Sequence, residues 1–174
     1  ESGTLGNPDS ELLWVVDPVD GTNAFAKQIP GFSVMIGLLH GNTPVLGVVY
    51  DPLDDWLYFA ASGQGAYAVG PGELEAKSVR VSARSGSDRP LISSPSVGEE
   101  LWQTILDEVG LVDGSRINSV GIKVGLLVRQ MGDVYFNHHS VSFWDTVAPL
   151  LIAREAGAES SMMNGRPFEY DLSD

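Results

Sequence analysis

Two aspartates three residues apart, Asp17 and Asp20, follow a short apolar run and precede a Gly-Thr pair. Pro18, between them, fixes the backbone φ angle and removes one amide donor, so we expect a stiff bend in which the Val19 carbonyl points the same way as both carboxylates. These three hard oxygen groups suit Mg²⁺, which prefers carboxylates together with water and phosphate oxygens. The stretch therefore predicts a magnesium site with Asp17, Val19 and Asp20 as ligands.

Gly21 and Thr22 come directly after this bend and begin a predicted short helix over residues 21–27. Main-chain amides at a helix N-terminus favour an anion, which makes Gly21 and Thr22 candidate phosphate-binding residues. A metal site and a phosphate site would then adjoin. The alternative is structural: Asp20 caps this helix and Asp17 begins a turn before the proline.

A third carboxylate, Asp145, lies in "SVSFWDTVAP" at the start of a predicted helix over residues 142–157. Ser142 and Asp145 are three residues apart and match a capping box, which would require no function. The other interpretation is that Asp145 joins the first two aspartates at one site. That interpretation predicts convergence of three carboxylates from distant parts of the chain.

The composition excludes several classes of function. With 23 acidic and 10 basic residues the formal net charge is −13, which argues against a nucleic-acid polymer or an anionic membrane as partner. A small phosphorylated metabolite would also be repelled unless bound divalent cations reversed the local field. The absence of cysteine excludes disulfides, thiolate catalysis and Cys-based zinc sites. No apolar stretch approaches the ~18 residues of a membrane span, and nothing resembles a signal peptide, so we expect a cytoplasmic protein.

These residues are expected on a mixture of strands and helices. Apolar runs separated by turn residues predict an antiparallel meander with strands at 12–16, 32–39, 45–50, 55–61 and 65–69. The first run is continuous, which is typical of a strand covered on both faces. Further strands are predicted at 79–83, 90–94, 133–137 and 158–163, and further helices at 98–110, 121–132 and 142–157. The mixture predicts a layered α/β or α+β architecture in one domain over residues 1–174.

Taken together, the motifs resemble the inositol monophosphatase superfamily of metal-dependent, lithium-sensitive phosphomonoesterases. The resemblance rests on "WVVDPVDGT", followed more than a hundred residues later by "SVG", "GDVY" and "WDTVAP". It implies the layered αβαβα sandwich of inositol monophosphatase and fructose-1,6-bisphosphatase. The family's first helices would precede the start of this chain, and a short C-terminal piece would follow its end, so we expect a fragment of a longer chain.

The resemblance also implies individual roles. Two or three Mg²⁺ ions would be held by Asp17, the Val19 carbonyl, Asp20, Asp145 and Glu1, which aligns with the second residue of an upstream Glu-Glu pair in the family. Thr22 would orient the attacking water, with Asp20 as the other catalytic residue. The Gly21 and Thr22 amides would hold the phosphate.

Three further positions bear on the substrate. Inositol monophosphatases have a Glu seven residues before the Trp-Asp aspartate, and here that position is His138. "SVGIK", which begins at Ser119, puts Lys123 where the bacterial 3'(2'),5'-bisphosphate nucleotidase branch has the lysine of a Ser-Ser-Leu-Lys segment. Such a lysine could meet a second phosphate as a point charge, and the alternative is an exposed helix residue. Lys123, Ser119 and His138 are therefore the predicted substrate-binding residues.

The neighbouring pair His138 and His139 also raises the question of a zinc site or a general base. Adjacent side chains on a strand point to opposite faces, so we expect at least one of these histidines to lie away from the pocket.

The hypothesis from the sequence is magnesium-dependent hydrolysis of a phosphate monoester on a small metabolite by a metal-activated water, with 3'(2'),5'-bisphosphate nucleotidase activity first. Inositol monophosphatase or fructose-1,6-bisphosphatase activity is the alternative within the same class. A non-catalytic phosphate- or metal-binding scaffold, and a domain in which the aspartates only cap helices, are the alternatives from other classes. A homodimer is a further expectation.

Overall fold

The computed structural model describes residues 10–82 and 88–170, so the predicted ligand Glu1 lies outside the described residues. The elements in chain order are β1 (Leu12–Asp20), α1 (Thr22–Ala26), β2 (Ser33–His40), β3 (Thr43–Asp51), β4 (Trp56–Ala61), β5 (Ala66–Val69), β6 (Lys77–Val79), β7 (Leu91–Ile92), α2 (Glu99–Val109), α3 (Val120–Val128), β8 (Val134–Tyr135) and α4 (Phe143–Glu155). The predicted mixture of strands and helices is confirmed.

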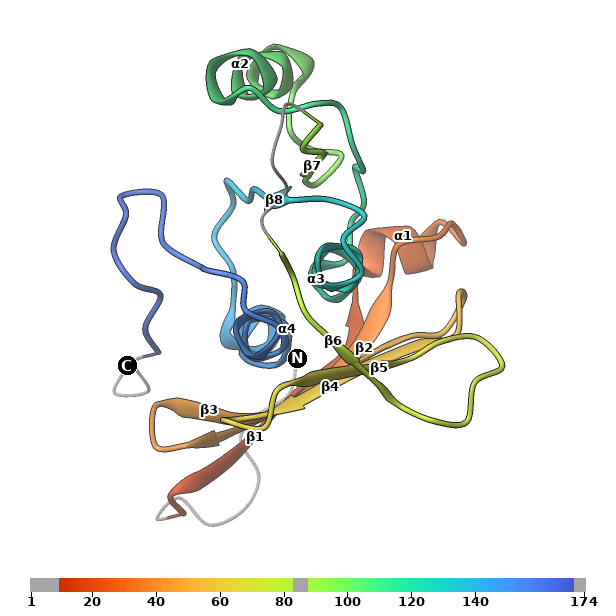
Figure 1. Ribbon diagram of the computed structural model, residues 1–174, viewed down its shortest axis with the longest axis vertical. Coiled ribbons are helices and arrows are strands. Elements are labelled where there is room, and N and C mark those ends of the chain that lie inside the picture. Colours follow the sequence, from red (N-terminus) through yellow and green to blue (C-terminus); the bar gives the residue numbers. More distant parts are fainter. Residues whose placement is uncertain (1–9, 83–87, 171–174) are drawn as a thin grey trace.

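The first six strands form one antiparallel sheet in which sequence neighbours are also spatial neighbours, from β1 to β6. This confirms the predicted meander. Along β2 and β5, buried residues alternate with half-buried ones, as expected when a strand is covered mainly on one face. Figure 1 shows α3 and α4 on the same side of this sheet. Their apolar residues pack with those of β2 to β5 in the largest core cluster.

A pair of facing glycines allows α4 to lie close against the sheet. Gly37 on β2 and Gly47 on β3 are register partners. A Cβ atom on Gly37 would lie 2.5 Å from Val147 Cγ1, and one on Gly47 would lie 2.6 Å from the Ala148 carbonyl oxygen. Any side chain at these positions would push α4 outward, so the two glycines fix how deeply the first turns of α4, and with them Asp145, approach the sheet.

Beyond the helix pair lie the small parallel sheet β7–β8 and then α2 (Figure 1). Sheet, helix pair, second sheet and helix correspond to four of the five layers of the predicted sandwich. Trp102 anchors α2 from within a second apolar cluster, and its Nε1 donates to Asp113 Oδ1 at 3.1 Å. The buried face of α2 is made by Trp102 and Leu106, whereas Leu101 and Val109, two of the apolar positions in the predicted helix, are 41% and 52% exposed.

Several predicted elements are wrong in extent or type. The strands expected at 90–94 and 133–137 are only β7 at Leu91–Ile92 and β8 at Val134–Tyr135. Residues 158–163 are not a strand, because no described segment pairs with them. The strand expected at 79–83 is β6 at Lys77–Val79, and the Val81 amide instead donates to the Ala156 carbonyl at the end of α4. The helix expected to reach residue 132 ends at Val128, since Gln130 takes a left-handed φ of 58° that turns the chain back.

The expectation that residues 12–16 are covered on both faces is also wrong for the described chain. Leu12, Trp14 and Val16 are about half exposed along one face of β1, which is an edge strand. Leu13 and Val15 pack inward against the cluster around Leu39. In the described part of the chain, no helix is long and apolar enough to cross a membrane.

Candidate metal centre

Three carboxylates converge as the sequence predicts. Asp17, Asp20 and Asp145 each offer one oxygen, and these oxygens lie within 4.8 Å of one another. Two come from the end of β1, and the third comes from the first turn of α4. β1 pairs regularly with β2 up to Asp17 and then shifts register before Asp20, across Pro18, which has no amide to give to the ladder. The resulting bulge turns both aspartates toward the start of α4.

Asp17 has both roles that the sequence suggested, since it forms a turn and also belongs to the carboxylate cluster. Its Oδ1 accepts the Val19 amide at 3.0 Å, which is the turn-forming bond predicted for an aspartate before proline. The carboxyl is half-buried. Burial raises its pKa to about 6; the Val19 amide opposes this shift, and the negative charges of Asp20 and Asp145 add to it. Asp17 therefore makes a tight turn and at the same time supplies a carboxylate whose pKa no positive side chain among the described residues lowers.

Asp20 does not cap α1, so that structural alternative is wrong. The N-cap of α1 is Gly21, in the left-handed region at φ 86°, where an added Cβ would collide with the Gly31 carbonyl. The Asp20 side chain turns inward instead and is 5% exposed. Its Oδ2 accepts hydrogen bonds from Ser119 Oγ at 2.5 Å and from the Gly121 amide at 2.9 Å, and Ser33 Oγ lies within donating distance at 3.1 Å.

Asp145 keeps the predicted capping contact as well as its place among the three carboxylates. Its Oδ2 accepts the Ser142 amide at 2.8 Å. Burial raises the pKa of Asp145, the Ser142 amide opposes the shift, and repulsion by Asp20 adds to it. A capping aspartate on an exposed helix would not carry these unfavourable charges beside it.

The three residues fit a hard divalent cation. All the ligand atoms are carboxylate oxygens, which suits Mg²⁺ better than a softer metal that selects nitrogen or sulfur. Two of the three groups, Asp17 and Asp145, have raised pKa values because they are partly buried beside other carboxylates. A cation among them would offset this repulsion.

Two of the other predicted residues lie beside the carboxylates. Thr22 is the first residue of α1 and is exposed, two positions after Asp20. Val19 lies in the bulge of β1, with its amide bound to Asp17. The catalytic role of Thr22, the phosphate-binding role of Gly21 and Thr22, and the metal contact of the Val19 carbonyl stay predictions.

Lys123 is not an exposed helix residue, so that alternative is wrong. It is 1% exposed, and its Nζ donates to Ser94 Oγ at 2.7 Å and to the Asn118 carbonyl at 3.0 Å. Nζ also lies 5.4 Å from the centre of the Tyr135 ring. Burial lowers the pKa of Lys123 to about 8, and the charges of Asp20 and Asp145 oppose this shift. A buried ammonium thus lies within electrostatic reach of two of the three aspartates.

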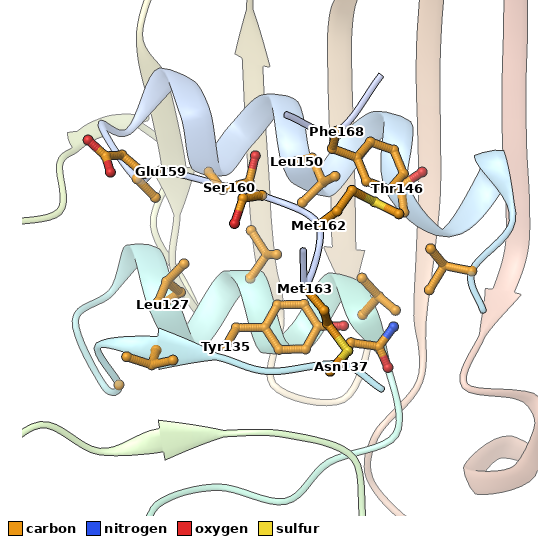
Figure 2. A pocket seen from close by; sticks show the side chains of 18 of the residues that line it. Leu127, Tyr135, Asn137, Thr146, Leu150, Glu159, Ser160, Met162, Met163 and Phe168 are labelled. Carbon is orange, nitrogen blue, oxygen red and sulfur yellow. The ribbon is translucent and has the colours of Figure 1, made fainter. Parts of the chain in front are cut away.

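The premise that the two histidines lie on a strand and point to opposite faces is wrong, whereas the expectation that at least one lies away from the substrate pocket stays a prediction. Their ring centres are 3.8 Å apart, and both line a cavity of about 1290 Å³ between α3, α4 and β8. β8 ends at Tyr135, and the Asn137 side chain bonds the His139 amide and carbonyl, so the chain turns here instead of continuing as a strand. Figure 2 shows Tyr135 pointing into the cavity, with Leu127 of α3 and Leu150 of α4 on its walls.

None of the three converging aspartates lines this cavity, although Thr146, the neighbour of Asp145, does. The cavity lining mixes apolar residues such as Leu127 and Leu150 with polar ones such as Asn137 and Glu159. A substrate contact for His138 stays a prediction.

One residue of the site was missed at the level of the sequence. Ser33 is the register partner of Asp20 across β1 and β2, and its hydroxyl meets the Asp20 carboxylate. A signal was available in the alternation of β2, where the buried positions are Ser33, Met35, Gly37 and Leu39. A polar side chain in an otherwise apolar buried row requires a partner.

Comparison with known proteins agrees with this geometry. A sequence model described as the inositol monophosphatase family matches residues 1–174. The chain belongs to this family.

Similar proteins include "Inositol monophosphatase 2" of Solanum lycopersicum, 35% identical over 94% of this chain, and "3'(2'),5'-bisphosphate nucleotidase CysQ" of Escherichia coli K12, 31% identical over 92% of it. "Nus factor SuhB" of the same bacterium is 32% identical over 95% of this chain. The chain spans 62%, 63% and 62% of these three relatives, respectively.

Among solved structures, CysQ from Bacteroides thetaiotaomicron, a member of the inositol monophosphatase family, superimposes with a TM-score of 0.78 at 29% identity, covering 94% of this chain and 66% of that one. Inositol monophosphatase from Anabaena (Nostoc) superimposes with a TM-score of 0.77 at 31% identity, covering 97% and 67%. The fold is therefore that of the inositol monophosphatase family.

Proposed function

We propose that this chain carries the metal-binding core of a magnesium-dependent phosphomonoesterase that acts on a small phosphorylated metabolite. The observation that carries the proposal is the convergence of Asp17, Asp20 and Asp145 within 4.8 Å, in a chain of this family. The three residues come from two segments far apart in sequence, the end of β1 and the start of α4. Capping alone does not account for that convergence, because Asp20 caps no helix and lies buried at the cluster.

Different residues of the chain would bind the metal, orient the attacking water and hold the phosphate. Asp17, Asp20, Asp145 and the Val19 carbonyl would hold two or three Mg²⁺ ions, which when bound lower the pKa of water and stabilise charge on phosphoryl oxygens. Thr22, exposed beside Asp20, would accept or donate a hydrogen bond that orients the attacking water. The Gly21 and Thr22 amides would hold phosphate oxygens.

For the substrate, we favour a 3'(2'),5'-bisphosphorylated nucleotide. The support is Lys123, an ammonium within electrostatic reach of Asp20 and Asp145, whose positive charge would attract a second phosphate. His138 in place of the glutamate of inositol monophosphatases removes a negatively charged carboxylate that would hold ring hydroxyls. The similar proteins carry names of both activities at nearly equal identity, so the preference depends on these two positions.

The test is phosphate release by the full-length protein from three substrates: 3'-phosphoadenosine 5'-phosphate, inositol-1-phosphate and fructose-1,6-bisphosphate. We expect Mg²⁺-dependent release that is fastest with the bisphosphorylated nucleotide and absent from an Asp145→Asn variant. Faster release from inositol-1-phosphate would replace the proposed substrate. Metal binding without release from any of the three would favour a non-catalytic scaffold, an alternative that gains weight from the relative named as a Nus factor.

A further inference from the structure

We propose that the hydroxyls of Ser33 and Ser119 are positioning groups for Asp20. They hold its Oδ2 inside the protein, so that Oδ1 alone is presented to a cation. The inference rests on the proposed function, because it concerns how this carboxylate is made ready to bind metal. It assigns a role to Ser33, and a role other than substrate binding to Ser119.

Ser33 and Ser119 reach Asp20 from different elements. Ser33 begins β2 directly opposite Asp20, and Ser119 is the N-cap of α3. Both serines have no exposed surface. Their oxygens lie 2.9 Å apart, at 3.1 Å (Ser33) and 2.5 Å (Ser119) from Asp20 Oδ2. Two elements distant in sequence thus meet on a single carboxylate oxygen.

Hydrogen bonds from the protein occupy the lone pairs of Asp20 Oδ2. A carboxylate oxygen has about two lone-pair sites, and Oδ2 already receives the Gly121 amide at 2.9 Å in addition to the hydroxyl network. Among the described residues, every hydrogen bond to the Asp20 carboxylate goes to Oδ2. A cation therefore has Oδ1 as its available ligand atom, and Asp20 would bind it through one oxygen.

The contacts of Ser119 also indicate which hydroxyl donates and which accepts. Ser119 Oγ accepts the Ile122 amide at 3.0 Å, which orients the hydroxyl so that its hydrogen points to Asp20. Ser33 can then donate either to Asp20 Oδ2 or to Ser119 Oγ. In both arrangements the hydroxyls are neutral donors, so they fix the carboxylate without competing with the cation as an ammonium would.

The other two aspartates are held differently. Asp17 and Asp145 each accept one main-chain amide and are about half-buried. Asp20, at 5% exposure, has lost nearly all its water and depends on the protein for its hydrogen bonds. Outer groups that orient a metal ligand typically change metal affinity by about 10- to 100-fold when they are removed. We expect removal of the Ser33 or the Ser119 hydroxyl to lower the metal affinity by a factor in this range.

The experiment measures Mg²⁺ affinity of the full-length protein by calorimetry, with Mn²⁺ binding followed by electron paramagnetic resonance as a second readout. Ser33→Ala removes the hydroxyl beside Asp20 Oδ2, and we expect it to weaken metal binding by about 10-fold. Ser119→Ala should do the same, and Ser119→Thr, which keeps the hydroxyl, should restore affinity. The matched control is Ser93→Ala, since Ser93 is equally buried but donates to the Phe136 carbonyl.

Ser119 is also a helix cap, so its alanine variant can fail to fold for a reason unrelated to metal. Ser33 caps nothing, and Ser33→Ala therefore decides the question. Ser33→Ala with the metal affinity of Ser93→Ala and the wild type would overturn the inference. Asp145→Asn tests the metal site separately from the positioning role. Full metal affinity in Asp145→Asn would show that the proposed metal site is wrong. Full metal affinity in Ser33→Ala, together with weakened affinity in Asp145→Asn, would show that only the positioning role is wrong.

Discussion

Asp17 on the first strand and Asp145 on the last helix bring one carboxylate oxygen each to within 4.8 Å of the other. Burial is the largest cause of the raised pKa of both groups, and the charge of Asp20 adds to it. A proton or a cation relieves the same repulsion. The two should therefore compete for this cluster.

We predict that Mg²⁺ affinity falls as the pH falls through about 6, the pKa of Asp17. Below that pH Asp17 binds a proton, which the cation must displace. Calorimetry between pH 5 and 8 measures the effect, and protons should be released on binding near pH 6. Affinity that does not change across this range would show that Asp17 is not a ligand.

The same residue should make the metal-free protein less stable at neutral pH. The folded pKa of Asp17 lies above its ordinary value of 3.8, so its contribution to folding is fully present below about pH 4 and is lost as the pH rises through 6. Asp17→Asn should raise the free energy of unfolding at pH 7 by at most about 1 kcal/mol, since the exposed half of the side chain is screened by solvent. Urea unfolding in chelator measures this, and Mg²⁺ should stabilise the wild type but not the variant.

Thr22→Ala should lower turnover far more than it lowers metal affinity. Thr22 is exposed at the start of α1, where its hydroxyl can meet a water without supporting the carboxylates. Loss of a group that positions the attacking water costs on the order of 100-fold in kcat. Thr22→Ser is the control and should keep most of the activity. Parallel losses of kcat and Mg²⁺ affinity in Thr22→Ala would make the threonine part of the metal site instead.

Sequence reasoning reached the meander, the helices and the three aspartates because each leaves a local pattern. The bend at Asp17 and Asp20 is encoded by Pro18, and the start of α4 by Ser142 and Asp145. What local patterns could not supply was the inward turn of Asp20. That turn depends on Ser119, which approaches from the N-terminus of α3 through tertiary packing alone.

The other wrong predictions have the same origin. A strand needs a neighbour to pair with, which the local sequence does not specify. The segment 158–163 has no such neighbour among the described residues and contains no β-branched or aromatic residue. The burial of Lys123 depends on Ser94 and Asn118, which lie outside its own helix. Helix periodicity alone left this position ambiguous, because nearly all residues of α3 are buried.

Glu155 should stabilise the hairpin between β4 and β5. Its two carboxylate oxygens accept the Gly63 and Gly65 amides, each at 2.9 Å, and the Gly63 bond is the main reason its pKa lies below 4.5. We expect Glu155→Gln to lower the free energy of unfolding by about 1 kcal/mol at pH 7. In the wild type this contribution is present above pH 4.5 and is lost as the pH falls through the folded pKa. Glu108→Gln, at an exposed position on α2, is the control for loss of a negative charge.

The last prediction concerns Lys123 and the choice of substrate. If its ammonium meets a second phosphate, Lys123→Met should raise KM for 3'-phosphoadenosine 5'-phosphate and leave kcat nearly unchanged, which is the mark of binding lost equally from ground and transition states. A charge-assisted hydrogen bond contributes about 1 to 3 kcal/mol, which corresponds to a rise in KM of roughly 5- to 150-fold. KM for a monophosphorylated nucleotide should stay within about twofold of the wild type.

Methionine is the suitable replacement because it fills the buried space that Lys123 occupies, although it leaves Ser94 and the Asn118 carbonyl without their donor. Thermal unfolding must therefore be measured beside the kinetics, and Ser94→Ala, which removes a neighbour of the ammonium but not the charge, is the matched control. Loss of stability alone would lower the amount of active enzyme for both substrates equally and leave KM unchanged. A rise in KM of the same size for both nucleotides would remove Lys123 from the specificity site, and would favour inositol phosphate as the substrate.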